Sequence, residues 1–313
     1  MDYQVLTAEQ ADQFVERGYV AIRGCFTRPA AEEYTAGIWT RLGYAPDDPA
    51  TWAEPSIHMP SHRVIDIRQF APKAWGAVCD LVGGEQRVAP YHWNDAFIVN
   101  LWQGAQRPWQ PASAESPGWH KDGDFFRHFL DSPEQGLLTL VLWSDVHHQG
   151  GATFVAADSV GPVARLLAQH PEGVYPPKIP WTGAEPEPAY FAWADLIAQC
   201  GDFVEATGTV GDVYLLHPFI LHAKAQNVLR VPRFITNPPV HLVEPMCFDR
   251  ADPGEYSLVE RAVLRGLGTD RYAFTPRGPR EELVPERVAL QRAMKQAEQE
   301  RLAAAGAPAA GKG

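Results

Sequence analysis

The middle of the chain contains a series of apolar runs that are short and rich in β-branched and aromatic residues. They lie at residues 95–102, 136–146, 151–158, 212–225 and 233–243, and turn-forming residues bound each of them. Runs of this kind predict β-strands, and their close spacing predicts a β-structured core. The 28 prolines and 26 glycines of the 313-residue chain fit the many turns that such a core needs.

Helical patterns precede and follow these strands. The first begins with an S/T-x-x-Q capping pattern at Thr7 and Gln10 and ends at Gly18, before a strand at 19–24. Helices are expected over residues 7–17, 28–43, 71–83 and about 279–305. Helices flanking a run of mostly antiparallel strands predict a mainly β fold of the α+β class, with helices packed on a jelly roll or barrel.

No clear linker or repeat divides the chain, so we expect a single domain over residues 1–305 with its jelly-roll core at about 90–245. A long insertion at about 161–203 has a short helical pattern at each end and a proline-rich centre. Long loops in compact domains often cover binding sites, so this insertion is a candidate lid. The low-complexity residues 306–313 are expected to form a disordered tail.

The chain carries a formal net charge of −11 at pH 7, and a surface of that sign repels phosphate backbones and anionic lipids. We therefore expect a small-molecule substrate, and neither nucleic acid nor a membrane as partner. The first residues, MDYQVLTAEQADQF, lack the basic and apolar regions of a signal peptide, so a cytoplasmic location is expected. The four cysteines lack C-x-x-C spacing, which argues against a disulfide framework or a structural zinc site.

The stretch PGWHKDGDFF, residues 117–126, places His120 two positions before Asp122. This pair is either a charged surface turn or two ligands of a metal site. A third ligand could come from His217 or His222, which both lie in one predicted strand run. Because they are five residues apart, a strand would put them on opposite faces, and only one could point into a barrel.

Four stretches in this order resemble the phytanoyl-CoA dioxygenase-like (PhyH) family of Fe(II)/2-oxoglutarate-dependent oxygenases. They are LTAEQADQFVERGYVAIRG, WHKDGDFF, SDVHHQGGATFV and GDVYLLHPFILHAKAQNVLRVPRF, which together span about residues 5–245. In that family, the second histidine of H-P-x-x-x-H binds iron and an arginine eleven residues later binds 2-oxoglutarate. The resemblance thus assigns His222 and Arg233 to these roles, leaves Arg230 as a turn residue, and implies a cupin-like double-stranded β-helix.

The chemistry of the family explains these residue types. His120, Asp122 and His222 would form the two-histidine, one-carboxylate facial triad of non-haem Fe(II) oxygenases, which leaves positions open for 2-oxoglutarate and O2. The planar guanidinium of Arg233 would bind the distal carboxylate of 2-oxoglutarate. The resemblance implies oxidation of an unactivated C–H bond with release of succinate and CO2. Halogenating relatives have a small residue at the place of Asp122, so its carboxylate favours hydroxylation or a related oxidation.

Further contacts are predicted around this centre. Asn100 and Lys224 are candidates for binding 2-oxoglutarate, since Asn100 precedes the H-x-D motif on a strand and Lys224 shares a strand face with His222. The alternatives are a structural amide and a lysine at the barrel mouth. His92, Trp93 and Phe125 are candidates for lining the substrate site, although aromatic side chains more often belong to the core.

Two other classes of function stay open at this point. The same three ligands could serve a cupin-like, metal-dependent isomerase or hydrolase that does not use 2-oxoglutarate, but such an enzyme has no need of Arg233. A jelly-roll binding protein with a vestigial metal site is the third reading. The sequence does not identify the substrate; its charge and aromatic content favour a small neutral or cationic metabolite.

Overall fold

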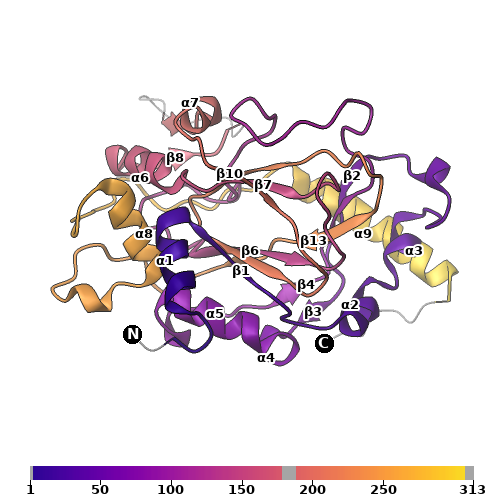
Figure 1. The fold of residues 1–313 in the computed structure, drawn as a ribbon, viewed down its shortest axis with the longest axis horizontal. Coiled ribbons are helices and arrows are strands. Elements are labelled where there is room, and N and C mark those ends of the chain that lie inside the picture. The colour runs from indigo at the N-terminus through magenta and orange to yellow at the C-terminus, as the bar shows by residue number, and fades with distance from the viewer. Residues whose placement is uncertain (1–2, 178–187, 307–313) are drawn as a thin grey trace.

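The computed structural model describes residues 3–177 and 188–306. Two antiparallel sheets form its centre, and helices cover them from outside (Figure 1). The larger sheet has the order β1 (Tyr19–Ile22), β11 (Val213–Leu216), β6 (Leu137–Leu142), β13 (Arg233–Thr236), β5 (Ile98–Asn100) and β2 (Ser56–His58), and β14 (Pro239–Val240) also pairs with β6. The smaller sheet has the order β10 (Phe203–Ala206), β7 (Thr153–Ala156) and β12 (Leu221–Lys224).

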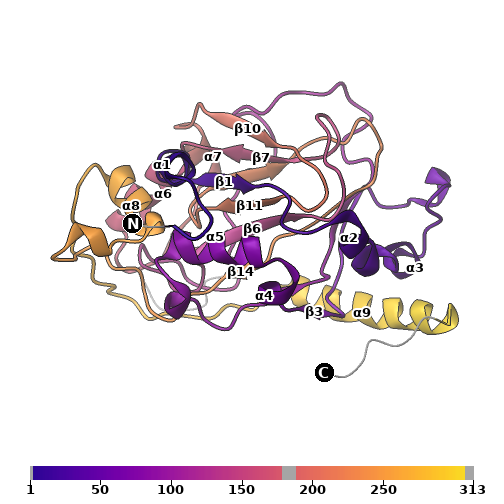
Figure 2. The ribbon, with the colours of Figure 1, turned by 60° about the horizontal axis from the view of Figure 1, so that its bottom comes forward.

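Figure 2 shows β7 and β10 on one side of β11 and β6, so the two sheets form separate layers. Every side chain of β6, β7 and β11 is buried, which means that both faces of these strands are covered. Two short ladders lie outside the layers: β3 (Val64–Ile65) with β4 (Trp93–Asn94), and β8 (Val174–Tyr175) with β9 (Ala189–Tyr190). The predicted β core with flanking helices, a jelly roll, is confirmed.

The predicted run 212–225 is two strands, β11 and β12, rather than one. His217 lies in the turn between them, where its ring accepts a hydrogen bond from the Phe219 N–H at 3.0 Å and its carbonyl accepts one from Ile220 at 3.0 Å. The argument that His217 and His222 share a strand is therefore wrong. The ring of His217 is fully buried, and burial lowers its pKa to about 3, so it is a neutral core histidine.

The predicted helices are present with two differences in their bounds. The helices of the described residues are α1 (Ala8–Arg17), α2 (Arg28–Thr35), α3 (Ile38–Leu42), α4 (Ile67–Phe70), α5 (Pro72–Val82), α6 (Val160–Gln169), α7 (Trp193–Ile197), α8 (Leu258–Leu267) and α9 (Arg287–Ala304), with 3-10 turns at Pro49–Thr51, Glu85–Arg87 and Pro253–Glu255. Two of these helices, α4 and α8, were not predicted. The capping box of Thr7 and Gln10 is present. The helix predicted over 28–43 is interrupted before Ile38, where Gly37 is the N-cap of α3. The last helix begins only at Arg287, two residues after Pro285, because a proline disfavours helical backbone in the residue before it.

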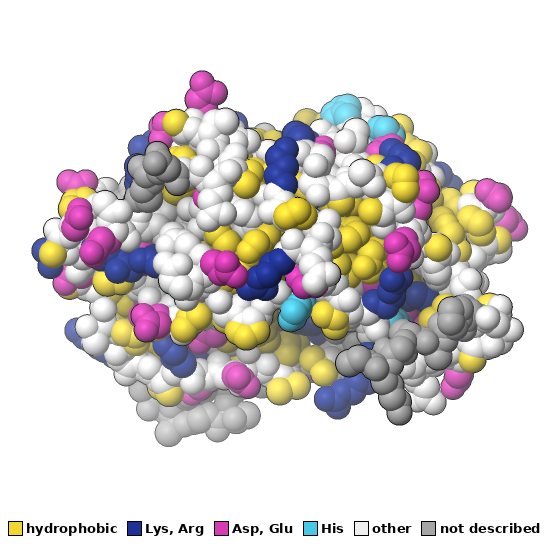
Figure 3. Space-filling view, turned by 90° about the horizontal axis from the view of Figure 1, so that it is seen from below, with side chains coloured by type: hydrophobic (Ala, Val, Ile, Leu, Met, Phe, Trp, Pro, Cys, Tyr) yellow, Lys and Arg dark blue, Asp and Glu magenta, His cyan; other side chains and the backbone are white. Residues whose placement is uncertain are grey.

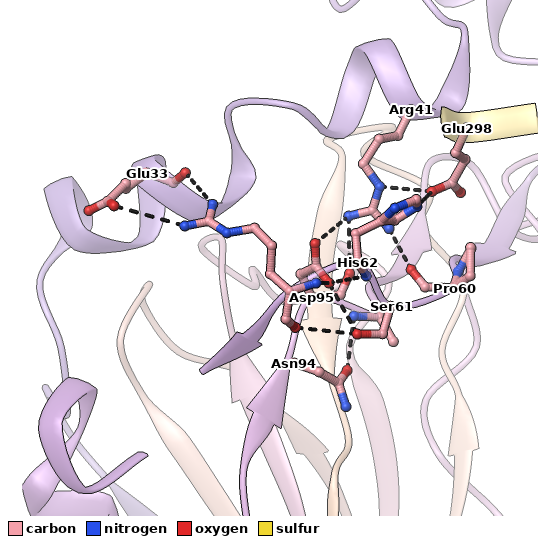
Figure 4. Close-up of polar contacts among 10 residues, drawn as sticks. Glu33, Arg41, Pro60, Ser61, His62, Asn94, Asp95 and Glu298 are labelled. Carbon is pink, nitrogen blue, oxygen red and sulfur yellow. Dashed lines mark hydrogen bonds and ion pairs between the residues drawn. The ribbon is translucent and has the colours of Figure 1, made fainter. Parts of the chain in front are cut away.

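The C-terminal helix α9 is polar on most of its surface and is held by buried charges. Its one fully buried side chain is Glu298, whose Oε2 accepts a hydrogen bond from Arg41 Nε at 2.8 Å and lies 2.8 Å from His62 Nε2. Arg41 also donates from Nη1 to Asp95 Oδ2 at 3.0 Å (Figure 4). These contacts fix α9 against α3 and against the segment before β3, because a buried charge is stable only when it is paired.

Two observations bear on the expected absence of nucleic-acid and membrane partners: the charge pattern of one face and the character of the helices. Figure 3 shows basic and acidic side chains interspersed among apolar ones on the face seen from below, without a broad basic stripe among its described residues. Among residues 3–177 and 188–306, no helix has both the length and the apolar character needed to cross a bilayer. The predicted disordered tail lies almost entirely outside the described residues, since positions 307–313 are not among them.

Candidate metal centre

The side chains of His120, Asp122 and His222 converge on one point. The Nε2 atoms of His120 and His222 lie 3.5 and 3.4 Å from Oδ1 of Asp122, and one potential ligand atom from each residue lies within 4.8 Å of the others. The backbones of the two histidines are joined by reciprocal N–H to carbonyl hydrogen bonds of 3.1 and 2.9 Å. The histidines are therefore cross-strand neighbours.

Both imidazoles are oriented by backbone carbonyls. Nδ1 of His120 lies 2.7 Å from the Gly118 carbonyl, and Nδ1 of His222 lies 3.4 Å from the Ile220 carbonyl. In the tautomer that donates from Nδ1, the Nε2 lone pair of each ring is free to bind a cation. The two Nε2 atoms face the carboxylate, so the donor set presents two neutral nitrogens and one anionic oxygen on one side of a common point.

Asp122 is held as an anion by its neighbours. Burial alone would raise its pKa, but the charges and hydrogen bonds of His222 and His120 outweigh burial and hold the pKa well below its usual range. Its second oxygen, Oδ2, accepts a hydrogen bond from Asn237 Nδ2 at 2.8 Å. Asn237 follows β13 outside the motifs used above, and so it was missed by the sequence analysis. It leaves Oδ1 as the oxygen that points to the histidines.

Replacing Asn237 by alanine is expected to weaken Fe(II) binding by about 10- to 100-fold, because the carboxylate of Asp122 loses the hydrogen bond that fixes its orientation. Equilibrium dialysis with Fe(II) under anaerobic conditions measures the effect. Asn94→Ala is the matched control, since Asn94 faces the same cavity but contacts none of the three side chains. Equal Fe(II) affinities for the two variants would contradict the assigned role of Asn237.

Metal binding is expected to strengthen as pH rises through neutrality. Burial alone would lower the pKa of His120, but the hydrogen bond to Asp122 and its charge outweigh burial and raise the pKa above 6.5. Below that raised pKa the ring binds a proton that a metal must displace, and above it the nitrogen is free. A plot of Fe(II) affinity against pH should therefore rise through this window and level off above it. An affinity that falls with rising pH would show that His120 is not a ligand.

The loop between the first two ligands is anchored by a buried lysine. Nζ of Lys121 donates to the Asp122 carbonyl at 2.9 Å and to Gln135 Oε1 at 3.2 Å, and it lies 2.9 Å from His128 Nδ1. Burial lowers the pKa of Lys121 to about 7. The side chain thus holds the backbone of the H-x-D motif against the core, a role that the sequence did not indicate.

Arg233 is a buried cation without a counter-ion. Its side chain is 1% exposed, and its Nε and Nη1 atoms donate to the carbonyls of Gly151 at 2.7 Å and Ile98 at 3.3 Å. No carboxylate among residues 3–177 and 188–306 forms an ion pair with it, and burial lowers its pKa to about 9. An unpaired buried charge is unstable, so the guanidinium is suited to an anionic ligand.

Two further basic groups lie near Arg233. Nζ of Lys224 is 2.7 Å from His58 Nε2 and 3.2 Å from Ser56 Oγ, both on β2. Burial, followed by the charge of Arg233, lowers the pKa of Lys224. Burial and the charge of Lys224 lower the pKa of His58 to about 4 although Asp122 acts in the opposite direction. His58 therefore feels the charges of both Asp122 and these cations, and it lies outside the sequence motifs described above.

Asn100 pairs with Arg233 across β5 and β13. Its amide donates to the carbonyls of Gly151 at 3.4 Å and Ala225 at 3.3 Å, and its own oxygen accepts a hydrogen bond from Gln103. Asn100 and Arg233 thus share the Gly151 carbonyl. This geometry gives Asn100 a role in positioning the guanidinium, and a direct contact with 2-oxoglutarate stays a prediction.

Two of the three candidate ligands, His120 and Asp122, line a cavity of about 640 Å³. Solvent exposure falls from one candidate ligand to the next: the side chain of His120 is 40% exposed, that of Asp122 22% and that of His222 9%. Phe125 lines this cavity, and its contact with a substrate stays a prediction. Trp93 and His92 do not line it: Trp93 is fully buried in an aromatic cluster of the core, and His92 is exposed elsewhere, so both substrate-contact predictions are corrected.

One part of the cavity wall comes from the C-terminal helix α9. The predicted lid, residues 161–203, contributes none of its described residues to this wall, and α6 packs against α8 instead. The proline-rich positions 178–187 of that insertion lie outside the described residues. Among the described residues, α9 therefore lines the cavity, and the insertion that was predicted to cover the site does not.

No protein-family model and no curated protein matches the chain. Among solved structures, it is similar to the epimerase SnoN in complex with Fe3+, alpha ketoglutarate and nogalamycin RO (18% identity, 74% of this chain and 82% of that one, TM-score 0.41). It is also similar to EctD from S. alaskensis with 2-oxoglutarate and 5-hydroxyectoine (17%, 78% and 78%, TM-score 0.41), and to the non-heme monooxygenase ThoJ with nickel (17%, 94% and 99%, TM-score 0.41). These likenesses are distant, so the chemistry has to be argued from the residues of the site.

Proposed function

We propose that this protein is an Fe(II)- and 2-oxoglutarate-dependent dioxygenase that hydroxylates an unactivated C–H bond of a small molecule, releasing succinate and CO2. One observation supports this above all others. A His-Asp-His donor set and the buried, uncompensated guanidinium of Arg233 occur in the same β core. A metal-dependent isomerase or hydrolase needs the donor set, but it has no use for a buried arginine that lacks an anionic partner.

The donor set fits Fe(II). Two neutral imidazole nitrogens and one carboxylate oxygen on one face of a metal leave its other positions open for cosubstrate and O2. The ligand atoms are each held by a partner: the histidines by backbone carbonyls and Asp122 by Asn237. When bound, iron with 2-oxoglutarate and O2 supplies an oxidant strong enough for an unactivated C–H bond.

The basic groups fit the dicarboxylate 2-oxoglutarate. Its C5 carboxylate would pair with Arg233 and restore the missing counter-ion, and Lys224 adds a second cation nearby. The Gly151 carbonyl, which accepts hydrogen bonds from both Arg233 and Asn100, fixes the direction of the guanidinium. The protein side chains thus bind and orient, and no acid or base among them needs to transfer a proton in this scheme.

An anaerobic titration tests the proposal without knowledge of the substrate. Addition of 2-oxoglutarate to the Fe(II)-loaded protein is expected to produce the visible charge-transfer absorption of an iron-bound 2-oxoacid, and admission of O2 should then yield succinate. Asp122→Ala should show neither signal. If 2-oxoglutarate fails to bind the iron-loaded protein, the oxygenase assignment is wrong. Metal-dependent turnover without O2 would favour the isomerase or hydrolase.

A further inference from the structure

We infer that the substrate of the proposed oxygenase carries an anionic group, a phosphate or a carboxylate, which Arg292 and Lys295 of α9 bind. This inference rests on the proposed function and names the substrate class of the same cavity. It departs from the sequence-based expectation of a neutral or cationic metabolite. The reason is the charge of the cavity wall, which the net charge of −11 does not reveal.

Helix α9 turns one face toward the cavity. Its lining residues are Arg287, Val288, Gln291, Arg292 and Lys295. Their spacing of three and four residues places them along a single stripe of the helix. Three of the five are basic, so this wall brings positive charge to a cavity that two of the predicted metal ligands also line.

Two of these cations have no partner among the residues that the structure describes. Arg287 forms an ion pair with Asp124, with Nη2 2.6 Å from Oδ1. Arg292 and Lys295, by contrast, make no side-chain hydrogen bond or ion pair with residues 3–177 or 188–306. The carboxylates of the cavity are already engaged, Asp122 by the two histidines and Asp124 by Arg287. The wall therefore keeps an excess of positive charge.

The position of this wall is fixed at both ends, which separates it from an ordinary basic helix surface. The Arg287–Asp124 ion pair holds the N-terminal end, and the buried contact of Glu298 with Arg41 and His62 holds the helix one turn beyond Lys295 (Figure 4). A polar helix gains little from hydrophobic packing, so the buried contact of Glu298 sets its place, and the half-exposed Arg287–Asp124 ion pair adds less. The segment of α9 that carries the exposed residues Arg292 and Lys295 consequently has a defined place beside the cavity.

The cosubstrate does not account for these cations. Arg233 on β13 and Lys224 on β12 supply positive charge for the two carboxylates of 2-oxoglutarate, together with the metal. Arg292 and Lys295 come from a different element and line the same cavity as His120 and Asp122. An anionic group of the substrate would satisfy them and tether the substrate at the helix while its remainder reaches toward the metal centre.

The test measures anion binding to protein loaded with nickel(II), in place of iron, and saturated with 2-oxoglutarate. The probes are inorganic phosphate, acetate and, as a cation, spermidine. We expect phosphate or acetate to bind wild-type protein, and the double variant R292A/K295A to bind it about tenfold more weakly. The control variant R261A/R265A removes the same charge from α8, which contributes nothing to this cavity, and should bind the anions as wild type does.

A second variant tests whether the position of α9, and not only its charge, determines anion binding. Glu298→Gln keeps the cations but weakens the buried contact with Arg41, so it should lower anion affinity while 2-oxoglutarate binding stays unchanged. Failure of both anions to bind, equal affinities for wild type and R292A/K295A, or tighter binding of spermidine would overturn the inference. Titrations with 2-oxoglutarate are done first: normal 2-oxoglutarate binding without anion binding overturns the inference alone, whereas absent 2-oxoglutarate binding overturns the proposed function.

Discussion

Replacing His222 by alanine is expected to lower the affinity for Fe(II) by at least about 100-fold, since loss of a ligand exceeds the 10- to 100-fold effect of losing a group that merely orients one. His222 is the least exposed of the three candidate ligands and contributes one of the two nitrogens that face Asp122. Metal content after dialysis against Fe(II), measured by atomic emission on the purified protein, gives the result directly.

His92→Ala is the matched control for this experiment. His92 is an exposed histidine outside the cavity, so its loss should leave the iron content unchanged. Far-ultraviolet circular dichroism should show the same fold for both variants, because the backbone bridge between residues 120 and 222 does not need the imidazole. Stoichiometric iron in the His222 variant would remove the basis of the proposed function.

Replacing Arg233 by methionine is expected to have two opposite effects. Affinity for 2-oxoglutarate should fall by about 100-fold or more, because truncating one partner of a buried charge pair removes roughly 3 kcal/mol. The free energy of unfolding without 2-oxoglutarate should rise by about 1–2 kcal/mol, since the folded state no longer holds an unpaired buried cation. Calorimetric titration and denaturant unfolding measure the two quantities.

The sign of the stability change follows from the pKa of Arg233. Burial lowers this pKa from 12.5 to about 9, so at pH 7 the charged guanidinium disfavours the folded state relative to the unfolded chain. Binding of 2-oxoglutarate should therefore raise the melting temperature of the wild type but not of Arg233→Met. Arg230→Met is the control, because Arg230 is an exposed turn residue three positions away. A 2-oxoglutarate affinity that is equal in both variants would refute the role of Arg233.

Elements of this fold could be predicted from the sequence where all the residues that define them lie in one short segment. The capping box at Thr7 and the glycine at position 18 define α1 within the chain itself. The run 212–225 was harder, because apolar composition alone does not reveal that residues 217–220 turn back between two strands. That turn is set by contacts of His217 with Gly18 and Val259, which lie far away in the sequence.

The residues of the candidate site fall into the same two groups: those within local sequence patterns and those that only the fold brings together. His120, Asp122 and His222 lie in recognisable local patterns, and the structure brings all three together. Asn237 and His58 lie in no pattern, and only the pairing of β2, β5 and β13 brings them near the ligands. The wall formed by α9 was missed because it depends on long-range contacts, those of Glu298 with Arg41 and His62 and that of Arg287 with Asp124.

The hydrogen-bonded backbones of His120 and His222 have a consequence for how the protein acquires its metal. The spacing of the two imidazoles follows from an isolated β-bridge, whose reciprocal backbone hydrogen bonds do not depend on a metal. Binding therefore does not have to drive folding, in contrast to zinc fingers, which unfold when stripped. A chelator should extract the ion and leave a folded, reloadable scaffold, so that loss and recovery of iron can be reversible over the lifetime of the molecule.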